Sequence, residues 1–268
     1  MTITVLVDNY TYIDKYLLGE PGFSAYVECG GDRILFDTGY SDVVVKNASA
    51  MGIDIAACNR IVLSHGHNDH TGGLKYIAER FDLSKKELIC HPLCFGEKYK
   101  EGEYIGAPFT EKKIAQMTQY TAVKTPYFLS KNCVFLGEIP QMVDFEKRYA
   151  LGKTNRGGIM IEDFLYDDSA LAFNTPDGIV ILAGCAHSGI CNIIEYAREN
   201  LQNYRVAAVI GGFHLSEVND RLKNTVAYMK KIGVGVVYPC HCVSLAAKFE
   251  MAKSLRVGEV GVGFKFSI

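Results

Sequence analysis

The chain has 268 residues, of which 49% are hydrophobic, so it is long enough and apolar enough to bury a large core. Its formal net charge is −2 and its lysines and arginines are scattered, which excludes the basic footprint of a protein that binds nucleic acid or a membrane surface. We therefore expect a small-molecule substrate as its partner, and the sequence leaves the oligomeric state open.

Two further features favour a cytoplasmic protein. Residues 1–7 alternate in polarity like a strand and lack the basic start and cleavage site of a secretory signal, and no later apolar run reaches membrane-spanning length. The nine cysteines have irregular spacing, which favours reduced thiols over a disulfide framework. We expect a cytoplasmic location on these grounds.

The beginning of the chain has the pattern of antiparallel strands. Strands are predicted over residues 3–7, 23–29 and 33–36, and Gly30-Gly31-Asp32 joins the last two as a hairpin. The third strand ends in Asp37-Thr38-Gly39, which places a carboxylate in a tight turn. Taken alone, such an aspartate is typical of a turn cap.

A short apolar strand at residues 61–63 stops abruptly at a loop that is rich in metal-binding side chains. The loop contains His65, His67, Asp69 and His70. Imidazole and carboxylate groups suit Zn²⁺, Fe or Mn. Side chains two residues apart point to the same side of an extended chain, so we expect His65 and His67 to share one ion, and Asp69 and His70 to face a second.

The first half of the chain also has helical periodicity in three places. These are residues 41–57, 74–81 and 110–120. The pattern is least regular between about 91 and 160, a tyrosine-rich region that we interpret as an insertion or a lid over the substrate. Arg148, Lys153 and Arg156, near its end, are candidates to meet an acidic group of the substrate, although such charges more often lie on a solvated face.

The unit of strand, loop and helix recurs three more times in the second half. Strands are predicted over 179–183, 206–210 and 234–238, and helices over 190–201, 220–231 and 244–255. The loops between them carry His187, His214 and His241 at equal intervals along the chain. Ligands in α/β proteins gather at the carboxyl ends of strands, so we expect at least two of these histidines to bind metal.

The spacing His65-x-His67-x-Asp69-His70 resembles the H-x-H-x-D-H signature of the metallo-β-lactamase superfamily, most of whose members are metal-dependent hydrolases. The resemblance implies an α/β fold, an αββα four-layer sandwich, with residues 1–268 as a single domain. It also implies that the aspartate of the Asp37-Thr38-Gly39 turn supports the metal ligands.

The same resemblance implies two divalent metal ions, with Zn²⁺ as the first expectation and Fe or Mn as alternatives. In this superfamily an aspartate after a second-half strand usually bridges the metals. Here Cys185 stands at that position after Gly184, so Cys185 is either a thiolate ligand or inert. His187 is then the best candidate to complete the first metal, and His241 fits the late histidine of the second. His214 is either an additional ligand or a group that polarises the substrate.

The motifs GCAHSG, GGFHL and PCHC, together with GEIP and LFDTG, resemble one branch of the superfamily. That branch is related to the archaeal enzyme that joins a dihydropterin to ribofuranosylaminobenzene phosphate. The resemblance implies a hydrolase in which a metal-activated hydroxide attacks a small ester, lactone or phosphoester, with Asp69 orienting that hydroxide. The sequence has neither a G-x-S-x-G elbow nor a Walker loop, so serine hydrolase and P-loop chemistry lack support.

Three alternatives compete with the hydrolase. A transferase would join 7,8-dihydropterin-6-methyl diphosphate to 4-(ribofuranosyl)aminobenzene 5'-phosphate and would use the metals to bind the diphosphate. A di-iron redox or metal-storage protein would need a flavin-bearing partner, because this chain has no flavin domain of its own. A (β/α)₈ amidohydrolase also begins with H-x-H, but the antiparallel start counts against it.

Overall fold

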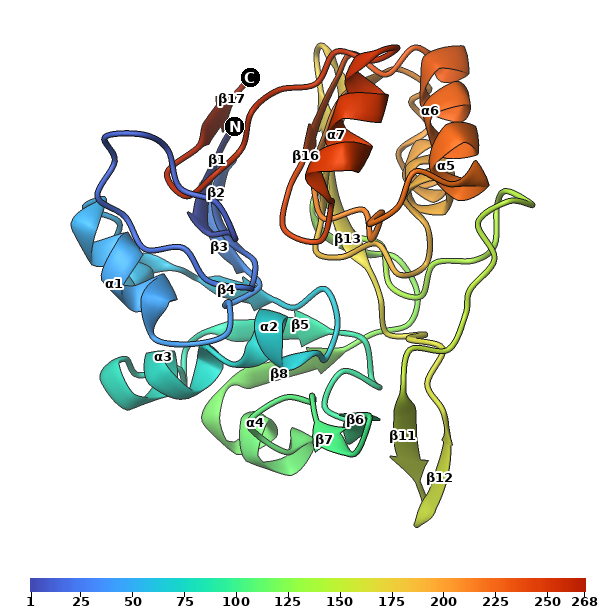
Figure 1. Cartoon of the computed structure of the whole chain (residues 1–268). Helices are drawn as coiled ribbons and strands as arrows, with labels where there is room; N and C mark the ends of the chain where they lie inside the picture. The colour runs from blue at the N-terminus through green and yellow to red at the C-terminus, as the bar shows by residue number, and fades with distance from the viewer. The chain divides into compact units, whose positions relative to one another are not determined.

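The computed structural model describes all residues, 1–268, and the chain forms two compact units (Figure 1). Unit 1 comprises Met1–Lys124, Ala150–Asp167 and Gly261–Ile268, and unit 2 comprises Thr125–Tyr149 and Asp168–Val260. None of the helices combines the length and the apolar character that crossing a membrane requires.

Unit 1 contains a seven-stranded sheet that is antiparallel at one end and parallel at the other. In spatial order its strands are β17 (Lys265–Ser267), β1 (Thr2–Val7), β2 (Ser24–Cys29), β3 (Asp32–Phe36), β4 (Arg60–Val62), β5 (Glu87–Cys90) and β8 (Gln119–Ala122). The hairpin from β2 to β3 turns at Gly30 and Gly31, whose φ angles of 59° and 93° are accessible to glycine without a steric penalty. Because β3, β4, β5 and β8 are parallel, their carboxyl ends lie at one edge of the sheet.

Three helices pack on one face of this sheet: α1 (Val43–Ala50), α3 (Leu74–Arg80) and α4 (Glu111–Met117). Leu35, Ile61 and Leu88 are paired neighbours on adjacent strands, so their side chains share a face. Their buried side chains belong to the same apolar cluster as Val44 of α1 and Leu74 of α3. Burial of this face removes apolar surface from water and so stabilises unit 1.

Three predicted helices are clearly shorter in the structure than the sequence pattern indicates, and one of them is the helix predicted over 244–255, which spans Leu245–Ala252. The pattern over 41–57 resolves into α1 and a separate 3₁₀ turn, η1 (Ile55–Ala57), because Gly52 with φ of 69° breaks the helix. The pattern over 110–120 ends at Met117, since the following residues pair with β5 as strand β8. Tertiary pairing therefore overrides local periodicity at this point.

Unit 1 also contains a four-stranded antiparallel sheet. Its strands, in spatial order, are β12 (Ile159–Glu162), β11 (Lys153–Arg156), β6 (Lys98–Lys100) and β7 (Glu103–Tyr104). The hairpin between β11 and β12 turns at Gly157 and Gly158, both with positive φ. The region predicted as an insertion, at about 91–160, thus supplies strands to this sheet, while β8 joins the seven-stranded sheet. Its role as a lid stays a prediction.

Unit 2 is built on a six-stranded sheet. In spatial order the strands are β16 (Val236–Pro239), β15 (Val206–Gly211), β14 (Gly178–Ala183), β13 (Ala170–Thr175), β10 (Cys133–Phe135) and β9 (Tyr127–Ser130). β14, β15 and β16 are parallel to one another, and the other pairs are antiparallel. The loops that leave the three parallel strands therefore lie at one edge of the sheet.

The helices of unit 2 follow these parallel strands, as the sequence predicted. They are α5 (Ile190–Leu201), α6 (Asp220–Ile232) and α7 (Leu245–Ala252) (Figure 1). Their buried side chains pack with the sheet in one apolar cluster. Asn219 caps α6 by accepting a hydrogen bond from the N–H of Leu222 at 3.1 Å, and Ser244 caps α7 through the N–H of Ala247 at 3.1 Å. Each loop is thus held between a buried strand and a capped or packed helix.

Candidate metal centre

The predicted ligand loop of unit 1 leaves the carboxyl end of β4 and passes into a one-turn helix, α2 (Asn68–Thr71), which the sequence pattern did not indicate. His65, His67 and Asp69 each offer a ligand atom, and these atoms lie within 4.8 Å of one another. His65 and His67 are buried, and their ring centroids are 4.6 Å apart. This donor set fits a divalent metal ion such as Zn²⁺.

His70 lies against the same group of side chains. Its ring centroid is 4.3 Å from that of His65, and its Nε2 is 3.6 Å from Oδ2 of Asp69. Asp69, whose side chain is 29% exposed, therefore lies close both to His70 and to the pair of His65 and His67. The sequence pattern predicted that Asp69 and His70 face one ion together, and their ligand atoms do lie within 4.8 Å of each other.

Asp37 organises the loop from the turn after β3. Its Oδ1 accepts the N–H of Ser64 at 2.7 Å, and its Oδ2 accepts both the Ser64 hydroxyl at 2.7 Å and Nδ1–H of His70 at 2.8 Å. Since the Ser64 hydroxyl donates to Asp37, its oxygen is left to accept Nδ1–H of His65 at 3.0 Å. Both imidazoles then carry their lone pair on Nε2, the form that a metal ion requires. Ser64 was not singled out from the sequence.

Burial also keeps His67 in the form that binds metal. Removal from water lowers the pKa of His67 to about 4, although the nearby Asp69 carboxylate acts in the opposite direction. The imidazole is therefore neutral at physiological pH, and a neutral ring can donate its lone pair to a cation.

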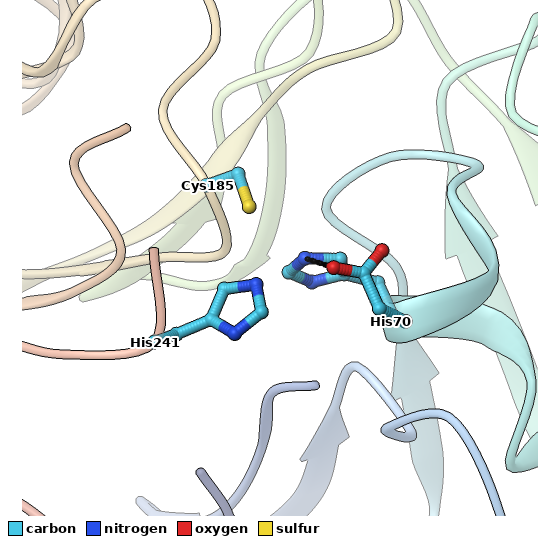
Figure 2. Close-up of side chains that lie close together, drawn as sticks. His70, Cys185 and His241 are labelled. Atoms are coloured by element: carbon cyan, nitrogen blue, oxygen red, sulfur yellow. Dashed lines mark ion pairs between the residues drawn. The ribbon is translucent and has the colours of Figure 1, made fainter. Parts of the chain in front are cut away.

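The loops of unit 2 carry the second set of predicted ligands. The Cys185 sulfur lies within 4.8 Å of a ring nitrogen of His187 and within the same distance of one of His241. Figure 2 shows Cys185 and His241 near each other. All three are at least nine-tenths buried. Cys185 thus stands between two imidazoles of its own unit, as a ligand shared by two ions would.

His214 is placed differently from the other histidines of unit 2. Its ring centroid is 4.5 Å from that of His187, and its Nδ1 is hydrogen bonded to the Tyr149 hydroxyl at 2.6 Å. His214 and His241 adopt left-handed backbone conformations with φ of 47° and 51°, which are uncommon for residues other than glycine. Such strain is concentrated at functional loops.

Asp168 holds the GCAHSG loop of unit 2 much as Asp37 holds the loop of unit 1. The buried Asp168 Oδ2 accepts both the N–H and the hydroxyl of Ser188, next to His187. The sequence reasoning missed Asp168, which lies just before β13. The only signal was its position, because the antiparallel pairing of Ala170 with Ala183 brings it level with the loop after β14.

Of the basic side chains considered for the substrate, Arg148 lies close enough to Asp168 to interact with its charge. Arg148 donates to the carbonyl of Ile139 at 2.9 Å, and Lys153 and Arg156 are exposed on β11. Lys153 borders a cavity of about 510 Å³ over the four-stranded sheet, which Tyr99, Met160 and Glu162 also line. None of the predicted ligands lines this cavity, so it is not the metal site.

An α/β fold with clustered histidines and a carboxylate at strand ends defines a class of metal-binding proteins, and comparison with known proteins identifies the family. Residues 18–87 match the metallo-β-lactamase superfamily. The chain is 32% identical to the uncharacterised protein MJ0448 of Methanocaldococcus jannaschii, over 97% of this chain and 98% of that protein. It is similar in structure to Tm1679, described as a metal-dependent hydrolase of the β-lactamase superfamily, with a TM-score of 0.86 and 30% identity over 100% of this chain and 99% of that one. The chain belongs to the metallo-β-lactamase superfamily.

A second relative bears on the predicted branch of the superfamily. The chain is 29% identical, over 92% of its length and 88% of the relative, to the 7,8-dihydropterin-6-methyl-4-(beta-D-ribofuranosyl)-aminobenzene-5'-phosphate synthase of Methanocaldococcus jannaschii. The predicted superfamily, its branch and its α/β fold class are therefore confirmed.

Proposed function

We propose that the protein is a metal-dependent hydrolase that acts on a small ester, lactone or phosphoester. The observation that carries this proposal is the set of His65, His67 and Asp69, whose ligand atoms lie within 4.8 Å of one another at the carboxyl end of β4. The similarity to Tm1679 over the full chain supports the reaction class.

The proposed ligands include all but one of the histidines of the chain. They are His65, His67, Asp69 and His70 in unit 1 and His187 and His241 in unit 2, with Cys185 and His214 as additional candidates. We propose two divalent ions, Zn²⁺ first and Fe or Mn as alternatives, because imidazole with carboxylate suits all three and a thiolate favours Zn²⁺ or Fe. Such ions, when bound, acidify a water molecule and polarise the oxygen of the substrate.

Asp69 has the best position for proton transfer in this proposal. Its side chain is 29% exposed, whereas the histidines around it are buried. A carboxylate that borders both the ligand group and solvent can orient the attacking water, accept its proton and release that proton to the medium. The buried imidazoles of His65 and His70, held in one tautomer by Ser64 and Asp37, do not exchange protons in this scheme.

A transferase is the second candidate, and the similarity to the named synthase favours it. In that reaction metal ions held by these ligands would bind the diphosphate of 7,8-dihydropterin-6-methyl diphosphate, and 4-(ribofuranosyl)aminobenzene 5'-phosphate would be the acceptor. A shared fold and shared ligands do not determine the substrate, so the hydrolase, which needs no second substrate, is the first choice.

Two assays test these candidates. Protein purified anaerobically is analysed for bound metals and then incubated with a panel of esters, lactones and phosphoesters, with the Asp69→Asn variant as the control for the proposed chemistry. Hydrolysis by the wild type and its loss in Asp69→Asn support the hydrolase. Incubation with the dihydropterin diphosphate and the aminobenzene acceptor yields a coupled product only if the protein is the transferase. Wild-type protein without bound metal contradicts both candidates.

A further inference from the structure

A buried carboxylate holds the backbone between the two predicted ligands His65 and His67. Gly66 lies between them, and its N–H donates to Oδ2 of Asp167 at 2.8 Å. A Cβ atom at Gly66 would lie only 1.8 Å from the carbonyl oxygen of Cys94, so the chain is also pressed against a neighbouring loop. The peptide that carries both imidazoles is therefore fixed from two sides.

Asp167 is in turn fixed by a buried lysine. Nζ of Lys98 is 2.9 Å from Oδ1 of Asp167 and 3.0 Å from Oδ2 of Asp163, and the three residues are between 1% and 5% exposed. Burial opposes the charge on each group, yet the two carboxylates raise the pKa of Lys98, and Lys98 holds the pKa of Asp167 below its usual value. Lys98 and Asp167 therefore form a buried ion pair.

The backbone that follows β7 holds the other side of the ligand loop. The N–H of Asn68 donates to the carbonyl of Ile105 at 2.8 Å, and the N–H of Ile105 donates to the carbonyl of Lys98 at 2.9 Å. Lys98 thus anchors the loop indirectly, at Gly66 through Asp167 and at Asn68 through Ile105. Both anchors flank His67.

We propose that Lys98 and Asp167 are positioning residues for the metal ligands of unit 1, acting through the N–H of Gly66. This inference rests on the proposed function, because it assumes that the loop binds metal. Gly66 has no side chain that could form a hydrogen bond, so its peptide N–H is the group through which Asp167 holds the loop at this residue. Asp163 supports this arrangement by accepting a second hydrogen bond from Lys98.

Positioning of the ligands matters because a metal ion tolerates only small displacements of the atoms that bind it. A rotation of the peptide at Gly66 displaces both His65 and His67, and ligand atoms must lie within a few tenths of an ångström of their places for tight binding. Loss of a group that orients ligands typically lowers metal affinity about 10- to 100-fold. We expect the same range for the loss of Lys98 or of Asp167.

A purely structural role for a buried lysine predicts a different result, and the chain provides a matched control. Lys86 is 5% exposed, and its Nζ donates to the carbonyls of Ala56 and Cys58, both at 2.7 Å. Lys86 is thus a buried ammonium of unit 1 whose hydrogen bonds go to residues outside the ligand loop. Lys86→Met and Lys98→Met remove the same group with the same change in side-chain volume.

The test measures metal affinity and metal geometry alongside stability. Co²⁺ affinity is measured by competition with a chromophoric chelator, the visible Co²⁺ spectrum reports ligand geometry, and thermal unfolding of the metal-free protein reports stability. Lys98→Met is expected to bind Co²⁺ at least about 10-fold more weakly, with a changed spectrum, while Lys86→Met keeps wild-type affinity even if its unfolding temperature falls. Asp167→Asn, which can satisfy Gly66 or Lys98 but not both, is expected to weaken Co²⁺ binding too.

Equal affinity and identical spectra for Lys98→Met, Asp167→Asn and the wild type would overturn the inference, as would an equal loss of affinity in Lys86→Met. If Lys98→Met does not fold, as judged by circular dichroism, Asp167→Asn decides. Wild-type protein that binds no Co²⁺ or Zn²⁺ would refute the proposed function instead, so the two failures are distinguishable.

Discussion

At the scale of single residues, carboxylates remote in sequence determine how the predicted ligands are presented. Asp37 sets the tautomers of His65 and His70 through Ser64 and Nδ1, and Asp168 holds the loop that carries His187 through Ser188. In both units one aspartate binds the N–H and the hydroxyl of one serine beside a histidine. Ligand identity is thus a local property, whereas ligand orientation depends on partners elsewhere in the chain.

Replacing His65 and His67 together with alanine should abolish metal binding and activity while leaving the secondary structure largely intact. Both side chains lie in a loop, and the sheets do not depend on them. Elemental analysis and circular dichroism measure the two effects. The matched control is His91→Ala, which removes another fully buried histidine, one outside the predicted ligand set. Normal metal content in the double variant would contradict the proposed site.

The thiol of Cys185 should become a metal ligand when ions are bound, since its sulfur lies within 4.8 Å of nitrogens of His187 and His241. Co²⁺-loaded wild-type protein is expected to show a near-ultraviolet thiolate-to-metal charge-transfer band that disappears in Cys185→Ser. Cys133→Ser, a change at a buried cysteine of β10, should retain the band. A band that persists in Cys185→Ser would show that Cys185 is inert, one of the two interpretations left open by the sequence.

At the scale of elements, the unit of strand, loop and helix explains why the ligand loops are well defined. Each parallel strand of unit 2 ends at the same edge, and each loop passes directly into a packed helix. The N-terminus of α5 is held by Glu146, whose carboxylate accepts the N–H groups of Cys191 and Asn192 at 2.7 and 3.0 Å. Glu146 is 1% exposed and also accepts the hydroxyl of Thr225 on α6 at 3.2 Å, so it links two helices.

The stability of unit 2 should therefore depend on pH through Glu146. Burial raises the pKa of Glu146 above its usual value of 4.5, although its hydrogen bonds act in the opposite direction. The folded state then holds a proton that the unfolded state has released, so the free energy of unfolding should decline as pH rises from 4.5 through the raised pKa.

Denaturant unfolding across this pH range measures the effect. Glu146→Gln, which cannot ionise, should lack that part of the decline, whereas Glu199→Gln on the exposed side of α5 should follow the wild type. The same pH profile in wild type and Glu146→Gln would show that Glu146 is not the group responsible.

At the scale of the whole molecule, predicted ligands occur in each of the two units, so we expect bound metal to stabilise the folded state. An ion that binds only the folded state stabilises it by about 2.7 kcal/mol at a free concentration 100-fold above its dissociation constant. We expect chelator treatment to lower the unfolding temperature and added Zn²⁺ to restore it, as measured by calorimetry. The variant without His65 and His67 should respond weakly to either treatment. An unfolding temperature that ignores both treatments in the wild type would argue against metal binding.

Many of the helices, strands and candidate ligands are predictable because each depends on a short stretch of sequence. The spacing His65-x-His67-x-Asp69-His70 places the donors within one loop, and the alternation of apolar strands with helices predicts α5, α6 and the order of unit 2. The branch of the superfamily is predictable for the same reason, since its motifs are local.

The sequence by itself determined which side chains can bind metal and which strand ends carry them, because spacing and periodicity are properties of neighbouring residues. Only the tertiary structure decided that Asp167 and Lys98 fix Gly66, that Asp168 holds Ser188, and that residues 119–122 form β8 rather than the end of a helix. These features depend on pairs of residues far apart in the chain. Such pairs meet only when the sheets assemble, and no local pattern records them.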